Sequence, residues 1–303
     1  MRRLGFLNAA IGACATMVAM GFANVAASQE RFVHPACEGL QAPERAYRKV
    51  IDGLEQTETL VIEGPEWDDV LVSNCLIQDV DGDGIIIRNV SNLTIRGCTI
   101  QDASGNGIRL RSSGSTDGVH IIDNSILSVG KNGISAAKRS ETSVDHTAAV
   151  IMGNRIIDSA LAETRGRQHG IYSQVSDVRI IGNLVSGIRG GNGISVRSSG
   201  LVACNLVEGV SKNGKPGIRY YPDHTTGPSR TLEVRNNRIL DAEVGIDLHA
   251  ETMGKSINDS DLVRNFRIID NILETEVPVR IHKRWQNSTF EVIVSGNKTI
   301  TAN

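Results

Sequence analysis

A glycine-led segment recurs along most of this chain, and the repeat limits the folds that the sequence can adopt. The glycine before the last strand of each repeat falls at Gly84, Gly107, Gly133, Gly170, Gly193, Gly217 and Gly245. Gly84 and Gly107 are 107 − 84 = 23 residues apart, and Gly170 and Gly193 have the same separation. Short runs of alternating apolar and polar residues, bounded by Gly and Asn, lie between them and are typical of β-strands. This periodicity predicts a solenoid.

Each repeat has room for three short strands, so the sequence predicts an all-β fold, a single-stranded parallel β-helix. We expect about nine to ten coils over residues 59–303, with equivalent positions stacked about 4.8 Å apart. One such column lies at the tight turn between the second and third strands. Its asparagines tolerate a left-handed backbone and can hydrogen-bond along the column. They are Asn124, Asn154, Asn183, Asn205, Asn237, Asn271 and Asn297, preceded in the same column by Cys75 and Cys98.

The repeat and its asparagine column resemble the right-handed parallel β-helix superfamily, which includes pectate lyases, polygalacturonases, alginate lyases and mannuronan epimerases. The resemblance covers residues 60–300 and implies a right-handed helix in a secreted lyase-like or epimerase-like protein. It selects no single activity, because the repeat is what the fold requires, whatever its chemistry.

The N-terminal residues are typical of an export signal. Met1-Arg2-Arg3 precede an apolar run, and Val25-Ala26-Ala27 supply the small residues of a cleavage site. Residues 1–27 are therefore predicted to be a signal peptide, and the mature chain, without a transmembrane segment, to be secreted or periplasmic. Ile11-Gly12-Ala13-Cys14 also resembles a lipoprotein box, which is less favoured because the apolar run continues past Cys14.

Residues 28–58 are predicted to form an N-terminal segment with one short helix over 42–54, which caps the open apolar end of the solenoid. The exported chain keeps Cys37, Cys75, Cys98 and Cys204, which allow three disulfide pairings. A Cys75–Cys98 bridge suits their stacked positions. The alternative is that the cysteines are small apolar fillers, and we favour this reading for Cys204.

The strand after each repeated glycine alternates inward apolar side chains with outward polar ones. The outward positions are Arg88, Arg109, Arg111, Tyr172, Gln174, Ser195, Arg197, Arg219, Tyr221, Asp247, His249, Arg280 and His282. Because coils stack in register, we expect these residues to share one face. A row of arginines at neighbouring positions repels itself, but it suits a partner with repeated negative charges. A merely polar solenoid surface is the alternative.

Five insertions lie beside this face, at 137–147, 159–168, 211–216, 222–230 and 250–265. Loops raised around one face of a rigid scaffold make a groove, so we expect the site among coils three to seven. His169 stands where other repeats have a turn asparagine and is a candidate general base. Tyr220-Tyr221-Pro222-Asp223-His224 is similar to a reordered Asp-Pro-His-Asp motif of mannuronan C5-epimerases.

Asp79, Asp81 and Asp83 form a calcium-like run, but no closing Glu follows, so a turn column is favoured over Ca²⁺. No cofactor is required by the predicted chemistry. Nucleic acid is disfavoured as a partner, because the chain has a net charge of −2 and only 4% aromatic residues. The oligomeric state is left open by the sequence.

The expected partner is an acidic, uronate-containing polysaccharide, and the expected reaction is β-elimination or C5-epimerisation. Removal of the C5 proton needs a neutralised carboxylate and a positioned base. Arg197 and Arg219 are the predicted neutralisers. The base and acid are sought among His169, Tyr172, Tyr221 and His224. Substrate binding is assigned to Arg88, Arg109, Arg111, Lys138, Gln174, Asp247, His249, Arg280 and His282.

Two alternatives stay open. A glycoside hydrolase of polygalacturonase type is suggested by Gln168-His169-Gly170 and Arg280-Ile281-His282-Lys283, which resemble motifs of that family. The family's central carboxylate elements are missing, although hydrolysis needs paired carboxylates. A non-catalytic, adhesin-like scaffold that only binds an acidic polysaccharide is the second alternative.

Overall fold

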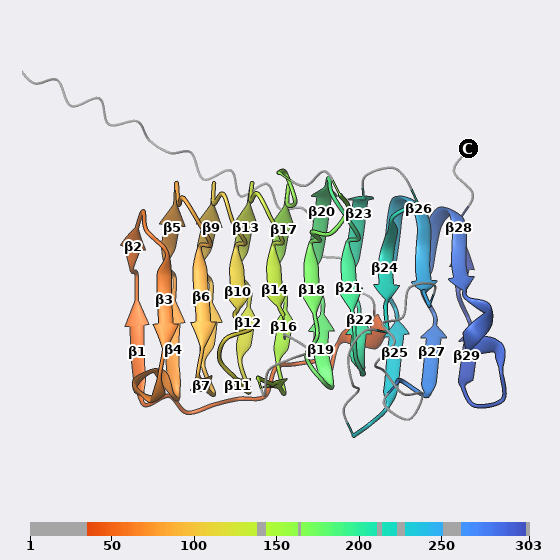
Figure 1. Cartoon of the computed structure of the whole chain (residues 1–303), viewed down its shortest axis with the longest axis horizontal. Coiled ribbons are helices and arrows are strands. Elements are labelled where there is room, and N and C mark those ends of the chain that lie inside the picture. Colours follow the sequence, from red (N-terminus) through yellow and green to blue (C-terminus); the bar gives the residue numbers. More distant parts are fainter. Residues whose placement is uncertain are drawn as a thin grey trace, which may run out of the picture. The chain divides into compact units, whose positions relative to one another are not determined.

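The computed structural model describes residues 35–137, 144–162, 165–210, 214–222, 228–250 and 262–300. These residues form a parallel β-helix, and its longest unbroken column has ten strands, one for each coil, as the repeat predicts. Figure 1 shows the strands running side by side in the order of the sequence. The predicted signal peptide lies outside the described residues.

Each coil adds one strand to each of three columns. The first column is the ten-stranded sheet of β1 (Lys49–Asp52), β4 (Val70–Ser73), β8 (Thr94–Arg96), β12 (His120–Ile122), β16 (Val150–Met152), β19 (Val178–Ile181), β22 (Gly200–Ala203), β25 (Thr231–Arg235), β27 (Asn265–Ile269) and β29 (Glu291–Ser295). The second column contains β2 (Glu55–Gln56), β5 (Leu76–Gln78), β9 (Thr99–Gln101), β13 (Ser125–Leu127), β17 (Arg155–Ile157), β20 (Leu184–Ile188), β23 (Leu206–Val210), β26 (Arg238–Leu248), β28 (Ile272–Ile281) and β30 (Lys298–Thr299).

The third column, which we call the site face, follows the repeated glycines. It contains β3 (Leu60–Glu63), β6 (Ile85–Arg88), β10 (Ile108–Leu110), β14 (Ile134–Ala136), β18 (Ile171–Ser173), β21 (Ile194–Val196), β24 (Pro216–Tyr220) and the second halves of β26 and β28. A separate three-stranded sheet contains β7 (Val90–Ser91), β11 (Thr116–Asp117) and β15 (His146–Thr147). In the chain, each of these strands follows a site-face strand and precedes a strand of the first column. Among the described residues, the 3-10 helices are η1 (Pro35–Cys37), η2 (Pro65–Trp67) and η4 (Lys283–Gln286).

The repeated glycine is explained by the distance between coils. A Cβ atom on Gly107 would lie 2.6 Å from the carbonyl oxygen of Gly133 in the next coil, and one on Gly133 would lie 2.7 Å from that of Gly170. Only glycine lets successive backbones stack this closely. The side chains that follow fill the interior, as Ile194 and Val196 do, and both are fully buried.

The predicted helix over 42–54 is wrong. Residues 49–52 are instead β1, which pairs in parallel with β4, and Glu55–Gln56 is β2. The exposed edge of β4 offers unpaired backbone groups, and a strand satisfies them better than a helix laid across the end.

Residues 38–48 form a strap along the first column instead of a cap (Figure 1). The strap crosses successive coils in reverse order. Arg179 Nη2 donates to Gln41 O at 3.5 Å, Arg45 Nη1 to Gly118 O, and Arg48 N to Asp69 O at 2.8 Å.

The predicted asparagine column is present, and we call it the long ladder: Asn124, Asn154, Asn183, Asn205, Asn237, Asn271 and Asn297. From Asn124 onward, each backbone N–H and each side-chain Nδ2 donates to the Oδ1 of the next asparagine at 2.8–3.0 Å. The left-handed residue is the one before each asparagine, for example Asp123 with a φ of 54°. The ladder asparagines therefore serve as hydrogen-bonding groups, and their predecessors make the turn.

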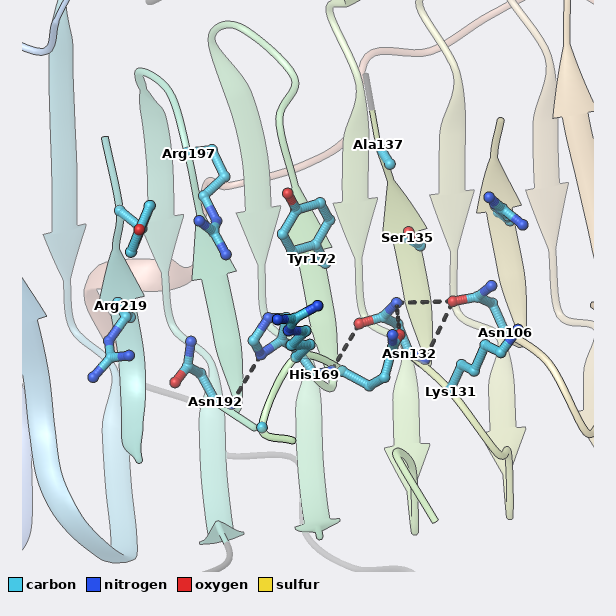
Figure 2. A pocket seen from close by; sticks show the side chains of 15 residues that line it. Asn106, Lys131, Asn132, Ser135, Ala137, His169, Tyr172, Asn192, Arg197 and Arg219 are labelled. Carbon is cyan, nitrogen blue, oxygen red and sulfur yellow. Dashed lines mark hydrogen bonds between the residues drawn. The ribbon is translucent and has the colours of Figure 1, made fainter. Parts of the chain in front are cut away.

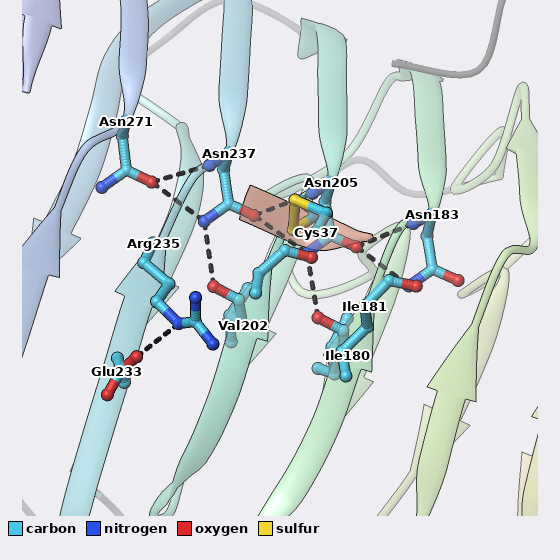
Figure 3. The surroundings of a disulfide bond; sticks show 12 residues. Cys37, Ile180, Ile181, Asn183, Val202, Asn205, Glu233, Arg235, Asn237 and Asn271 are labelled. Carbon is cyan, nitrogen blue, oxygen red and sulfur yellow. Dashed lines mark hydrogen bonds and ion pairs between the residues drawn. A yellow bond between two sulfur atoms is a disulfide. The ribbon is translucent and has the colours of Figure 1, made fainter. Parts of the chain in front are cut away.

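Two disulfides are formed, Cys75–Cys98 inside the column and Cys37–Cys204 between the strap and the coils (Figure 3). The filler interpretation of Cys204 is wrong. Cys204 occupies the left-handed position before Asn205, with a φ of 61°, so its side chain is directed away from the ladder and toward the strap. Disulfides persist in oxidising compartments, and the two bridges agree with export.

Candidate functional site

The predicted register of the site face is confirmed. Arg109, Ser135, Tyr172, Ser195, Arg219, Asp247 and Arg280 are paired successively across neighbouring strands. A second set of residues, two positions later in the chain, is stacked as well, because each backbone N–H donates to a carbonyl of the preceding coil. These residues are Arg197, Tyr221, His249 and His282. Residues that are far apart in sequence therefore lie next to one another.

A pocket of about 580 Å³ opens on this face (Figure 2). Its described lining contains five cationic side chains and no carboxylate. The lining residues are Asn106, Arg109, Lys131, Asn132, Ser135, Ala137, Gly166, Arg167, Gln168, His169, Tyr172, Asn192, Arg197, Arg219 and Tyr221. Such a lining favours an anionic ligand.

Flat side chains form a continuous stack across this pocket. The rings of His169 and Tyr172 are 5.6 Å apart and nearly parallel. The Arg197 Cζ atom lies 4.9 Å from the Tyr172 ring centroid and 4.4 Å from that of Tyr221, which in turn stacks on His249 at 5.3 Å. From Tyr172 to His249 the spacing follows from the distance between coils, and cation–π contacts hold the guanidinium in place.

Several arginines of the site face form ion pairs with aspartates. Asp247, only 1% exposed, receives Arg219 Nε at 2.8 Å and Arg280 Nη2 at 2.9 Å on the same carboxylate oxygen, Oδ2. Arg109 pairs with Asp83 at 3.1 Å. Burial lowers the pKa of Arg219, and the attraction of Asp247 opposes this shift. The negative charges of these aspartates thus reduce the repulsion between arginines on neighbouring strands.

A second hydrogen-bonded column, which we call the short ladder, runs along the pocket. Its members are Asp83, Asn106, Asn132, His169 and Asn192, and all of them except Asp83 form the floor of the pocket. Each backbone N–H donates to the side chain of the preceding member, at 2.8, 3.2, 2.7 and 2.9 Å in order. His169 thus replaces a ladder asparagine, as its position in the repeat predicts.

The short ladder fixes the proton of His169. Asn192 N can only donate, so His169 Nδ1 accepts and the ring proton of the neutral imidazole lies on Nε2. Burial, together with the positive charges of Arg197, Arg219 and Lys215, holds the pKa of His169 well below 6.5. The ring is therefore neutral in ordinary buffers and presents a hydrogen-bond donor.

The aspartates of the calcium-like run belong to turn columns. Ser104 Oγ donates to Asp81 Oδ1 at 2.9 Å, and Asp79 has a left-handed φ of 54°. Burial raises the pKa of Asp83, but the hydrogen bonds from Asn106 and the ion pair with Arg109 outweigh it, so the pKa lies below its usual value. The described part of the chain contains no cluster of metal-binding side chains, and Ca²⁺ here is supported by the sequence alone.

The structure gathers only part of the predicted set. His169, Tyr172, Arg197, Arg219, Tyr221 and Arg109 line the pocket. Asp247, His249 and Arg280 stand behind them or at the next coil. The others lie outside the lining: Arg88 pairs with Glu63, Gln174 is buried, Arg111 points outward, and His282 Nδ1 accepts from Arg284 N at the start of η4. Lys138 and His224 lie outside the described residues.

The sequence reasoning missed Lys131 and Arg167, which add two of the five cations, and the amide floor of Asn132 and Asn192. Arg167 lies in the insertion at 159–168, so the insertions were the signal that could have found it. Each of the five insertions contains residues outside the described part of the chain, so the groove that they are expected to form stays a prediction.

Comparisons with known proteins bear on the fold. Residues 66–149 match the family model described as a right handed beta helix region. A comparison with curated protein sequences gives no match. The catalytic unit of a GH87 alpha-1,3-glucanase from Streptomyces thermodiastaticus strain HF3-3 is similar, with a TM-score of 0.55 at 13% identity over 82% of this chain and 55% of that one.

Two further structures match less closely. A GH136 lacto-N-biosidase from Eubacterium ramulus gives a TM-score of 0.46 at 14% identity, over 86% of this chain and 46% of that one. The periplasmic alginate epimerase AlgG gives 0.38 at 12% identity, over 83% and 76%. The chain spans about half the length of the glucanase unit and of the biosidase. The match to the family model and the similarity to the glucanase unit support a right-handed parallel β-helix. In the described residues, no helix is long and apolar enough to cross a membrane.

Proposed function

We propose that this protein acts on a uronate-containing polysaccharide by removing the C5 proton of a sugar, as a lyase or a C5-epimerase. The similarity to an alpha-1,3-glucanase supports a glycan as the ligand class. The cationic lining of the pocket supports an acidic one. The proposal depends most on one observation, the Arg197 guanidinium held between the rings of Tyr172 and Tyr221.

Arg197 is the group that neutralises the uronate carboxylate. A neutralised carboxylate can accept the charge that develops when the C5 proton leaves. The phenol oxygens of Tyr172 and Tyr221 are carried by the two rings that flank the guanidinium, so both can exchange protons with a sugar bound there.

His169 takes a different role from the general base that the sequence suggests. Its Nδ1 accepts from Asn192, and Nε2 carries the proton. We therefore assign it as a neutral donor to substrate oxygen, and the proton transfers fall to Tyr172 and Tyr221.

The bonds balance in both reactions. In elimination, the base takes the C5 proton, the C–H electron pair forms the C4=C5 double bond, and O4 leaves with the C4–O4 pair and receives a proton. In epimerisation, the same electron pair is held as an enolate-like intermediate, and a proton returns to C5 from the opposite face.

Hydrolysis fits this pocket less well. It needs two carboxylates about 5 to 9.5 Å apart. The described lining contains none, and Asp83 and Asp247 behind it are already engaged by arginines.

Incubation with alginate, pectate and glycosaminoglycans tests the proposal. Elimination gives unsaturated uronates that absorb in the ultraviolet, and epimerisation changes the ratio of the two uronates. Arg197→Met should abolish either product, whereas Arg155→Met, an exposed arginine on β17 outside the pocket, should not. Absence of both products for every acidic polysaccharide would overturn the proposal, and retained binding would then indicate the non-catalytic scaffold.

A further inference from the structure

The short ladder stops inside the pocket for a covalent reason. Asn192 is paired in register with Pro216, because Ile194 pairs with Ile218 on β21 and β24. At every earlier step the next residue donates its backbone N–H to the side chain of the ladder member before it. Proline has no N–H, so the step from Pro216 to Asn192 cannot form.

The interruption leaves a buried acceptor without a partner. Asn192 is 2% exposed, its Oδ1 has no hydrogen-bond partner, and the residue lines the pocket. Figure 2 shows its side chain between His169 and Arg219. The amide oxygens of Asn106 and Asn132 accept from the following coil, so the oxygen of Asn192 is oriented in the same way. An unpaired buried carbonyl costs free energy unless a ligand or water donates to it.

A second polar atom on the same strand is in a similar state. Ser195 Oγ is fully buried and has no hydrogen-bond partner. Ser195 is paired in register between Tyr172 and Arg219, in the same part of the site face. Ser195 is not part of the described pocket lining, whereas Asn192 adds an unpaired acceptor to the cationic side chains of that lining.

We propose that Asn192 Oδ1 accepts a hydrogen bond from a free hydroxyl of the sugar whose carboxylate is held at Arg197. A carbonyl oxygen repels an anion, so its ligand is a donor and not a second carboxylate. The substrate ring thus presents a carboxylate to the cations and an unsubstituted hydroxyl to the floor. This inference rests on the proposed function and adds a specificity-determining residue to it.

Pro216→Ala tests the inference, because alanine restores the missing backbone donor and occupies Asn192 Oδ1 from within the protein. Asn192→Ala removes the acceptor and is the second variant. Pro278→Ala, on β28 and outside the pocket lining, is the matched proline control. Calorimetric titration uses short oligosaccharides of mannuronate, guluronate and galacturonate, and a glucan oligosaccharide as the neutral probe.

Both pocket variants should bind uronate oligosaccharides about tenfold more weakly than the wild type, which is the effect of losing one hydrogen bond. Pro216→Ala should unfold at a temperature no lower than Pro278→Ala does. Unchanged affinity in both pocket variants would overturn the inference and leave the proposed function standing.

The remaining outcomes separate the two proposals. Binding of the glucan alone, weakened by Pro216→Ala, would support the hydroxyl site and overturn the acidic substrate. Binding of no oligosaccharide by the wild type would overturn both.

Discussion

The two ladders are built by the same rule and serve different ends. In the long ladder, side-chain acceptors receive the backbone N–H groups of the preceding coil, and all seven members are asparagine. In the short ladder the direction is reversed, the first member is Asp83, the fourth is His169, and Pro216 ends the series. The uniform column stabilises the turns, and the irregular one lies under the pocket.

The difference shows how a solenoid acquires a site without changing its fold. A ladder position fixes a side chain from both sides, so whatever replaces the asparagine is held rigidly. His169 accepts the ladder hydrogen bond from Asn192 N at Nδ1 and carries a donor at Nε2, which an asparagine would lack. Asn192 keeps its backbone hydrogen bond and gains an unpaired oxygen.

The largest effect is expected from Asn183→Ala in the long ladder. The substitution leaves the Asn154 N–H, the Ile151 carbonyl and the Asn205 amide oxygen without Asn183 as their partner. Buried unpaired groups cost about 1–3 kcal/mol each, so the free energy of unfolding should fall by about 4 kcal/mol. Denaturant unfolding measures this loss, and activity per folded molecule should stay unchanged. An unaltered unfolding midpoint would show that the long ladder does not stabilise the fold.

The matching change in the short ladder, His169→Asn, should act on turnover instead. Asparagine restores the residue found at the neighbouring ladder positions, so the unfolding temperature should hold. Losing the Nε2 donor should lower kcat about 100-fold, the usual cost of one preorganised donor. His169→Ala, which breaks the ladder as well, should lose both stability and activity. Full activity in His169→Asn would confine His169 to a structural role.

Removing the strap disulfide tests whether the long-ladder side is independent of the pocket. Cys37→Ser with Cys204→Ser should release residues 38–48 and lower the free energy of unfolding by about 2 kcal/mol. Limited proteolysis should detect cleavage in the strap, and Kd for a uronate oligosaccharide should not change. A parallel loss of ligand affinity would show that the two sides are coupled.

The smallest effect concerns pH. The pKa of His169 is well below 6.5, and that of His120, buried beside Arg45 and Arg179, is lowered to about 4. The unfolded chain therefore takes up protons below pH 6.5 that the folded chain does not, so stability falls as the pH drops from 6.5 toward 4. His169→Asn should make this decline shallower, as measured by unfolding at pH 7.5 and 5. If the free energy of unfolding declined equally with pH in the variant and the wild type, groups other than His169 would cause the decline.

The fold could be predicted from the sequence because every coil restates the same constraint. The register is revealed by the repeated glycine, where a Cβ atom would clash with the next coil, and by the stacked asparagine. This register places Tyr172, Arg197 and Arg219 together. The N-terminal segment carries no repeat, and the predicted helix over 42–54 failed because the open edge of β4 competes for that chain.

The site was only partly predictable for a similar reason. Lys131 and Arg167 lie in turns and insertions, where no period assigns a direction to a side chain. The ion pairs of Asp83 and Asp247 depend on side-chain reach between coils, which the alternation of a strand does not report. The proton position on His169 follows from a single backbone donor, Asn192 N, which only coordinates reveal.

Proton nuclear magnetic resonance of a uronate polysaccharide incubated with the protein in deuterium oxide shows whether the C5–H bond is broken. Elimination and epimerisation both break this bond, so the H5 signal should decline with the wild type and persist with Arg197→Met. Cleavage of the chain with every H5 retained, or tight binding with no change at C5, would contradict the proposed chemistry at C5.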